Sequence, residues 1–189
     1  VYVGLRPLAA PKEGGKSTKE VSRSHKVHVT PSGMVDIIGG KWTTYRQMAE
    51  DAVDAAIKEN VLPAKECKTV DLKIHGHQPA DEKSHLGLYG SDRAAIEKLA
   101  AADAKAGSKI HPDYPFLYAE ALWAVREEMA QTLEDVLARR IRFLFLDARA
   151  AAEVAEDVAR YIAAELGKDE AWVKEQTASF RELAKQYHF

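Results

Sequence analysis

The chain has 189 residues, 46% hydrophobic and 30% charged, enough for one ordinary domain or two small ones with a buried core. No run of 18 apolar residues occurs, which excludes a transmembrane helix, and a single cysteine excludes an internal disulfide. The start, VYVGLRPLAA, lacks an initiator methionine and the features of a secretory signal. We therefore expect part of a longer polypeptide from a reducing, cytoplasmic compartment.

The net charge of −2 is unevenly distributed along the chain. Residues 1–46 hold eight Lys and Arg against three acids, a balance of +5, so the remainder carries −7. A basic segment beside an acidic body favours a small anionic ligand or a phosphate group, although a solvated loop with extra lysines has the same composition. Nothing in the chain resembles a nucleic-acid-binding module.

The first elements in chain order are two short strands. Lys26–Thr30 alternates between apolar and polar residues, a Pro-Ser-Gly turn follows, and Met34–Ile38 is a second apolar run. The sequence therefore predicts a hairpin. From Thr43 the apolar spacing becomes helical, and Thr43 or Thr44 is expected to cap the start of that helix.

An irregular linker is expected from about residue 60 to residue 90, because prolines and glycines recur there. One short strand is predicted within it, at Thr69–Ile74. Cys67 has no adjacent His or helix start to activate it, so we expect a buried or inert thiol.

The C-terminal 100 residues have the pattern of a small helical bundle. The first predicted helix is capped by Ser91 and runs to about Asp103, and the second is Phe116–Met129. A short helix is opened by a capping box of Thr132 and Asp135 and ends near Arg140. The last two are Ala148–Leu166, capped by Asp147 and ended by Gly167, and a helix capped by Asp169 that reaches about Tyr187.

The doubled glycine before the first helix is the most informative feature for function. Gly39 and Gly40 allow the backbone to approach a ligand closely, and the unpaired N–H groups of the following helix start favour negative charge. Lys41 adds a full positive charge. Such a site suits a phosphate or the electron-rich end of a reduced flavin, although a Gly-Gly pair before a helix is often only a tight turn.

A second stretch, Gly4-Leu5-Arg6-Pro7-Leu8, places an arginine between a strand end and a proline. The guanidinium of Arg6 in such a fixed position can grip a phosphate or carboxylate in a bidentate way. Most arginines are surface residues, so this feature alone identifies no site.

Together these stretches resemble FAD-dependent glycerol-3-phosphate dehydrogenases, from about Val1 to Ala184. The resemblance is carried by GLRPL, STKEVSRSHKVHV and SGMVDIIGGKWTTYRQMAEDAVD, then by LGLYGSD and HPDYPFLYAEALWAVREEMAQTLEDVLARRIRFLFLDARAA. The first group is similar to the end of that family's catalytic part, and the second group to its C-terminal helical domain. GGKWTTYR and LEDVLARRIRFLFLDARAA, in this order, are the most specific motifs.

This resemblance implies that the parent protein oxidises sn-glycerol 3-phosphate to dihydroxyacetone phosphate. A hydride would pass from C2 to FAD, and electrons would pass on to a quinone, or to oxygen in the related oxidases. It also implies that Arg6 and Lys41 line the substrate pocket, and that the flavin ring is contacted by Gly39, Gly40, Lys41, Trp42, Thr43 and Thr44. His25 and Lys41 both remain candidates for the general base.

The family's dinucleotide-binding fingerprint, G-x-G-x-x-G, is absent from these 189 residues. We therefore expect an α+β remnant of an FAD-binding α/β body over residues 1–67 and a mostly α-helical C-terminal domain over residues 68–189. On that basis the N-terminal FAD-binding half is missing, and the isolated chain neither retains FAD nor catalyses the reaction. A non-catalytic helical module, and a related FAD-dependent oxidase with another substrate, are the alternative interpretations.

Three other groups of residues have simpler interpretations. His75, His77 and His85 are expected on a surface linker, with no metal site, because no ligand spacing joins them. Trp123 and Trp172 are expected in the core. The basic cluster Arg139, Arg140 and Arg142, interleaved with apolar residues 141–146, fits a buried helix end or a peripheral contact with the inner face of the cytoplasmic membrane.

Overall fold

A computed structural model describes residues 24–79 and 84–187 of the chain. These residues are mostly helical, with one two-stranded sheet. The chain divides into two compact units between Lys73 and Ile74, a little beyond the boundary expected after Cys67. That the first unit belongs to a larger FAD-binding body remains a prediction.

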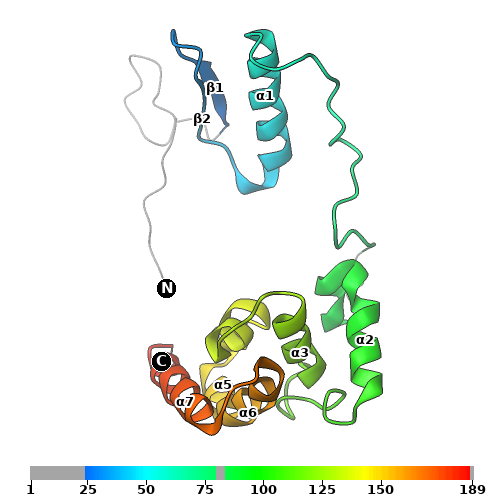
Figure 1. Cartoon of the computed structure of the whole chain (residues 1–189), viewed down its shortest axis with the longest axis vertical. Helices are drawn as coiled ribbons and strands as arrows, with labels where there is room; N and C mark the ends of the chain where they lie inside the picture. The colour runs from blue at the N-terminus through cyan, green and yellow to red at the C-terminus, as the bar shows by residue number, and fades with distance from the viewer. Residues whose placement is uncertain (1–23, 80–83, 188–189) are drawn as a thin grey trace. The chain divides into compact units, whose positions relative to one another are not determined.

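The first unit is a hairpin beside one helix (Figure 1). Strands β1 (Lys26–Val29) and β2 (Val35–Ile38) are antiparallel, and Lys26 lies opposite Ile38 in the register. Gly33 in the connecting turn has a φ of 85°, a conformation that suits glycine. The predicted hairpin is confirmed, with each strand one residue shorter than expected.

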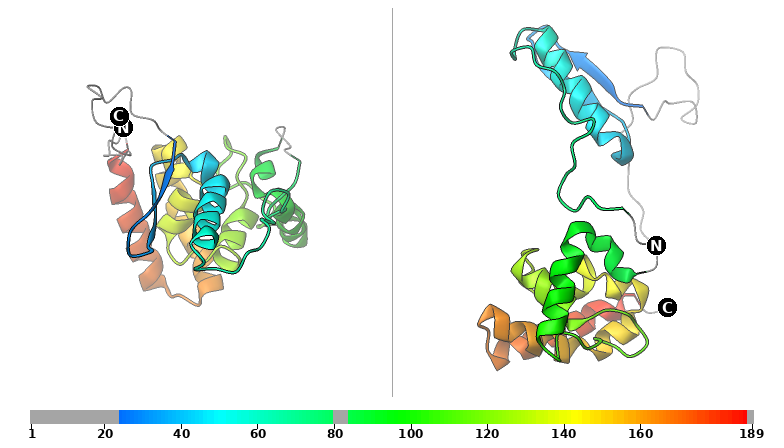
Figure 2. Two further views of the ribbon diagram at one scale, coloured as in Figure 1. Left: turned by 90° about the horizontal axis from the view of Figure 1, so that it is seen from above. Right: turned by 90° about the vertical axis from the view of Figure 1, so that its right-hand side faces the viewer.

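A doubled-glycine turn joins the hairpin to a 3-10 turn, Trp42–Thr44, and then to helix α1 (Tyr45–Lys58). Helix α1 lies along the hairpin, as the two views of Figure 2 also show. No residue of α1 is fully buried. A two-stranded sheet with one helix is too small to enclose a core, so this unit leaves apolar surface open.

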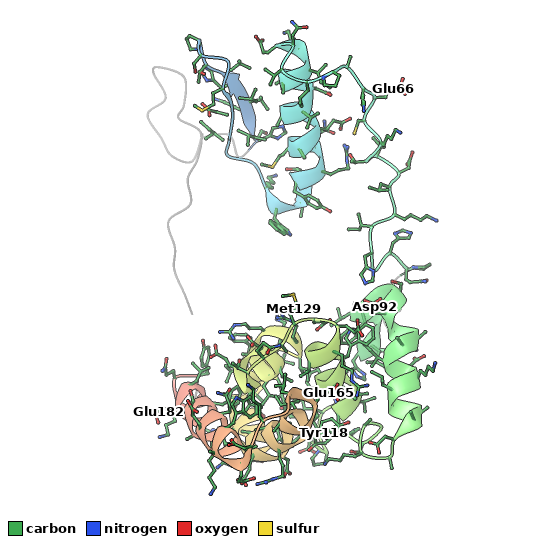
Figure 3. All side chains as sticks on the ribbon, in the orientation of Figure 1. Glu66, Asp92, Tyr118, Met129, Glu165 and Glu182 are labelled. Carbon is green, nitrogen blue, oxygen red and sulfur yellow. The ribbon has the colours of Figure 1, made fainter. Side chains whose placement is uncertain are left out.

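The segment that follows α1 is irregular, and Glu66 marks it in Figure 3. The strand predicted at Thr69–Ile74 is wrong. Its apolar side chains, Val70, Leu72 and Ile74, are each at least 60% exposed. Alternating residues form a strand only when a neighbouring strand pairs with them, and no described strand pairs with this segment.

Over its described residues, the second unit consists of helices and irregular connections, with one isolated antiparallel bridge between Lys109 and Leu117. Its elements are a 3-10 segment at His85–Asp92, α2 (Arg93–Ala102), α3 (Tyr118–Arg126), a π-helix at Asp135–Arg140, α4 (Phe143–Leu146), α5 (Ala148–Glu153), α6 (Ala155–Leu166) and α7 (Glu170–Lys185). The predicted helical bundle is therefore confirmed for the described residues. The helix expected at Phe116–Met129 is shorter at both ends.

The core of the second unit consists of two clusters of buried side chains. The larger cluster gathers around Phe143, Leu137, Ile162 and Phe180, and the smaller one surrounds Ile96. Aromatic contacts connect the helices; the ring of Tyr118, labelled in Figure 3, lies edge-on 5.0 Å from that of Tyr161. The two tryptophans expected in the core are partly exposed, and each packs against one cluster, Trp123 on the smaller and Trp172 on the larger.

Several predicted helix boundaries are confirmed by their capping contacts. Asp169 accepts a hydrogen bond from the N–H of Trp172, and Gly167 ends α6 with a φ of 63°. Thr132 and Asp135 form the expected reciprocal pair, with N–H to side-chain distances of 3.0 and 3.1 Å.

Two boundary predictions are wrong. Ser91 caps no helix; Ser84 caps the preceding 3-10 segment instead, by accepting from the N–H of Leu86. The single helix predicted at Ala148–Leu166 is two helices, because Val154 has a φ of −83° and a ψ of −4°, values typical of turns rather than helix interiors.

Asp147 links the start of α5 to the aromatic core. Its carboxylate accepts from the N–H groups of Arg149 and Ala150, both at 3.0 Å, and from the hydroxyl of Tyr114 at 2.7 Å. These donors hold the pKa of Asp147 below its ordinary value of 3.8, first through Ala150 and then through Tyr114. A lowered pKa in the folded state means that the carboxylate stabilises the fold above pH 3.8, and that this contribution is lost as the pH falls through the folded-state pKa.

We therefore expect Asp147→Asn to lower the melting temperature at pH 7, and the difference from wild type to shrink below pH 3.8. The difference in melting temperature between the two proteins is measured by thermal unfolding, followed by circular dichroism, between pH 3 and pH 7. A difference that stays constant across this range would show that the charge of Asp147 contributes nothing.

Candidate functional site

The candidate site is the doubled-glycine turn between β2 and α1. Gly39 and Gly40 have φ values of 78° and 89°, which L-residues with side chains rarely adopt. Gly40 is also buried, and a Cβ built on it would lie 2.5 Å from Sδ of Met48 and 3.2 Å from Cβ of His25. The positive φ therefore favours glycine at position 40, and any side chain there would also have to displace the flexible end of Met48.

The helix start after this turn offers backbone donors. The N–H of Thr44 donates to the carbonyl of Lys41 at 3.1 Å, and its hydroxyl donates to the same oxygen. The described residues supply no acceptor for the N–H groups of Trp42 and Thr43, as expected at the start of a helical segment. The prediction that Thr43 or Thr44 caps the helix through its side chain is wrong, because neither hydroxyl accepts from a following N–H.

Apolar and charged side chains surround these donors. We call the exposed group Ile38, Lys41, Trp42, Thr43 and Tyr45, with its backbone amides, the turn patch. Trp42 is 87% exposed, Tyr45 54% and Ile38 47%, and the two aromatic rings lie 6.0 Å apart. Large aromatic side chains exposed beside unpaired donors are typical of a binding surface rather than of a finished protein exterior.

His25, one of the two candidate bases, is directed toward α1. Its Nε2 lies 2.6 Å from Oδ2 of Asp51, and its side chain is 17% exposed. The amide of Gln47 donates to the other oxygen of Asp51 at 2.7 Å. These two contacts, Gln47 first and His25 second, hold the pKa of Asp51 below its ordinary value. Nε2 of His25 is thus engaged with Asp51, and a role for His25 as the general base remains a prediction.

Arg6, the other predicted substrate residue, lies outside the described residues. The structure places Gly39, Gly40, Lys41, Trp42, Thr43 and Thr44 together as the turn and helix start. Their assignment to substrate and flavin remains a prediction.

Cys67 is exposed, so of the two expected alternatives a buried thiol is wrong, and an inert thiol remains a prediction. Its Sγ lies 3.1 Å from the hydroxyl of Thr69 and 3.9 Å from Nη1 of Arg46. The irregular segment carries Cys67 along the outside of α1, where no core forms around it.

The predicted histidine group is separated by its contacts. His75 lies 2.7 Å from Asp92, whereas His85 lies 3.0 Å from Glu120 and is only 25% exposed. His85 is therefore not a surface linker residue. Within residues 24–79 and 84–187, no group of three or more His, Cys, Asp or Glu side chains is arranged to hold a metal ion.

The basic cluster at the start of α4 combines buried and exposed residues. Arg139 pairs with Glu134 and Asp135, and Arg140 binds the backbone carbonyl of Glu128. Among the interleaved apolar residues, Ile141, Phe143 and Leu144 are buried, which confirms the core interpretation for these three. Phe145 and Leu146 are each more than half exposed. No helix in the described part of the chain is both long and apolar enough to cross a bilayer.

Sequence reasoning missed a buried carboxylate in the second unit. Glu120 is 2% exposed and accepts from the hydroxyl of Tyr89 at 3.1 Å and from the N–H of Leu117 at 2.7 Å. Burial, and then the charge of Glu120, raise the pKa of Tyr89. The sequence contains one sign of this role, because Glu120 is the third residue of α3, the position of the glutamate in a capping box. The motif is incomplete in sequence, since Leu117 occupies the position where a capping box has Ser or Thr.

A protein-family model described as the C-terminal domain of alpha-glycerophosphate oxidase matches residues 32–173. The chain belongs to this family. The match includes the whole doubled-glycine turn and most of the helical unit, so the alpha-glycerophosphate oxidase C-terminal domain family spans both compact units.

The individual relatives that match this chain are named as glycerol-3-phosphate dehydrogenases. A probable mitochondrial glycerol-3-phosphate dehydrogenase of Caenorhabditis elegans is 37% identical over 88% of this chain and 26% of its own length. Mitochondrial glycerol-3-phosphate dehydrogenases of Arabidopsis thaliana and Bos taurus are 35% and 31% identical, over 98% and 96% of this chain and 34% and 28% of their lengths. The chain thus spans between about a quarter and a third of these relatives.

Proposed function

We propose that this chain is the C-terminal part of an FAD-dependent enzyme that oxidises sn-glycerol 3-phosphate to dihydroxyacetone phosphate. The observation that carries the proposal is the turn patch: unpaired amides, a lysine and exposed aromatic rings within the residues that match the family. The names of the relatives supply the substrate, and their greater length supplies room for the flavin-binding part.

The donor set of the turn patch fits a flavin. When bound, FAD would accept the hydride that leaves C2 of the substrate. The N–H groups of Trp42 and Thr43 and the ammonium of Lys41 would stabilise negative charge at the edge of the ring. Gly39 and Gly40 keep side chains off the turn, so these donors stay accessible. In this proposal Arg6 holds the substrate phosphate or the developing carbonyl oxygen.

The electron acceptor is proposed to be a quinone, reached through peripheral contact with a membrane. The family name includes an oxidase, so oxygen is the competing acceptor. The relatives are named as mitochondrial, and nothing in the described residues supports the cytoplasmic location expected from the sequence. Reoxidation of the reduced enzyme by a soluble quinone, compared with hydrogen peroxide release in air, separates the two acceptors.

The test of the proposed function is reduction of the flavin in the full-length protein. The purified protein is expected to contain about one FAD per chain, and anaerobic glycerol 3-phosphate is expected to bleach the flavin absorption. Glycerol without phosphate is the control and should leave the spectrum unchanged. A full-length protein that holds no flavin, or whose flavin glycerol 3-phosphate does not reduce, would contradict the proposal.

A second candidate function, a non-catalytic helical module, is favoured by one observation. Both core clusters lie wholly in the second unit, between Leu86 and Ala184, so that unit has a core without the turn patch. We propose that residues 68–189 act as a domain that stabilises the enzyme and contributes little to the chemistry. Removal of this domain should then lower thermal stability more than it lowers turnover of the enzyme that remains folded.

A further inference from the structure

His25 connects three parts of the first unit. It lies one residue before β1, its Nε2 is 2.6 Å from Oδ2 of Asp51 in α1, and its Cβ is 3.2 Å from the position a Cβ on Gly40 would take. The contact between His25 and Asp51 joins residues 26 positions apart in sequence. His25 therefore stands directly before the strand, and its side chain lies close to both the glycine turn and the helix.

Asp51 is well suited to anchor this contact. It lies in the second turn of α1, and its other oxygen accepts from the amide of Gln47 at 2.7 Å. A carboxylate that accepts hydrogen bonds on both oxygens is held in one orientation, and a hydrogen bond to a charged acceptor is stronger than a neutral one. Nε2 of His25 acts as the donor to this carboxylate, which fixes the position of the imidazole ring.

The packing around Gly40 transmits this constraint to the turn. The end of the Met48 side chain from α1 and Cβ of His25 both lie next to the position that a Cβ on Gly40 would take. If the contact with Asp51 were lost, His25 would be free to move its Cβ away from Gly40, which would loosen a turn whose two glycines are intrinsically flexible. The donors of Trp42 and Thr43 and the ammonium of Lys41 follow directly, so their positions depend on that turn.

We propose that His25 and Asp51 are positioning residues, which hold the Gly39-Gly40 turn against α1 and thereby fix the donors of the turn patch. This inference rests on the proposed function for its catalytic consequence, but its structural consequence can be measured without it. Supporting groups that lock the orientation of a site are needed because small misplacements of reacting groups cost large factors in rate.

The hairpin contains a matched control pair. His28 and Asp36 face each other across β1 and β2, with Nδ1 and Oδ2 4.0 Å apart and side chains 67% and 37% exposed. The two residue types are the same as in the proposed pair, but this pair lies across the two strands, and His28 is not among the nearest neighbours of a Cβ built on Gly40. His28→Ala therefore reports on the general tolerance of the hairpin.

The experiment uses the full-length enzyme with His25→Ala, His25→Gln, Asp51→Ala and His28→Ala. We expect His25→Ala and Asp51→Ala each to lower kcat about tenfold, with KM changed less than about threefold and FAD content unchanged. Hydrogen–deuterium exchange of the amides of residues 39–44 should become faster in both variants. His25→Gln, whose amide can donate to Asp51, should recover most of kcat and of the protection, and His28→Ala should match wild type.

Two results would overturn the inference: wild-type exchange at residues 39–44 in His25→Ala, or equal losses in His25→Ala and His28→Ala. If the proposed function is wrong, the same experiment gives a different pattern of results. In that case no variant affects the oxidation of glycerol 3-phosphate, while exchange at residues 39–44 still responds to His25→Ala and not to His28→Ala.

Discussion

Replacing Lys41 by alanine in the full-length enzyme is expected to lower kcat for glycerol 3-phosphate oxidation about 100-fold, while FAD stays bound. Lys41 is exposed and directly precedes Trp42 and Thr43, and it supplies the only full positive charge within the turn patch as defined. Charge that develops in the transition state near this patch would lose its strongest partner. Steady-state kinetics and the ratio of flavin to protein absorbance measure the two parts of the prediction.

Lys58 supplies the matched control for this substitution. It is an exposed lysine in the last turn of α1, the helix that follows the turn, so Lys58→Ala removes the same charge far from the turn. We expect Lys58→Ala to retain wild-type kcat. Equal kinetics in Lys41→Ala and wild type, or equal losses in the two variants, would remove Lys41 from the active site.

Phe143→Ala is expected to destabilise the helical unit by about 3–5 kcal/mol, the range found for truncation of a buried phenylalanine. The ring of Phe143 is fully buried, and its centroid lies 4.7 Å from that of Tyr114 and 5.3 Å from that of Phe116. Since domains of this size are stable by only about 5–15 kcal/mol, such a loss brings the unit close to unfolding. Urea unfolding of the chain, followed by circular dichroism, measures the change.

Phe145, two residues further along α4, is the control for Phe143. It is 54% exposed, and its ring contacts that of Tyr187 at 5.5 Å. We expect Phe145→Ala to change stability by less than about 1 kcal/mol, because little packed surface is lost. Similar effects of the two substitutions would contradict the assignment of Phe143 to the core.

The features that the sequence predicted well depend on residues near one another in the chain. The hairpin around Gly33, the caps at Asp147 and Asp169 and the end of α6 at Gly167 are each determined within a few residues. The doubled-glycine turn belongs to the same class, because its positive φ values follow from local sequence.

The features that failed depend on contacts that spacing does not reveal. The strand predicted at Thr69–Ile74 needed a neighbouring edge, and the burial of Cys67 needed a core around it. The contact between His25 and Asp51 spans 26 residues, so no local pattern indicates it. For the same reason, local spacing predicts an exposed linker at His85 and gives no sign of its contact with Glu120, which is 35 residues away.

The central claim is that the amides and the lysine of the turn patch face the flavin. The most direct measurement is the midpoint potential of FAD in the full-length protein, compared between wild type and Lys41→Ala. Loss of the positive charge should lower the potential by about 30 mV or more, which is a tenfold change for a two-electron couple. An unchanged potential, with FAD bound in both proteins, would show that Lys41 does not act on the flavin and would contradict the account.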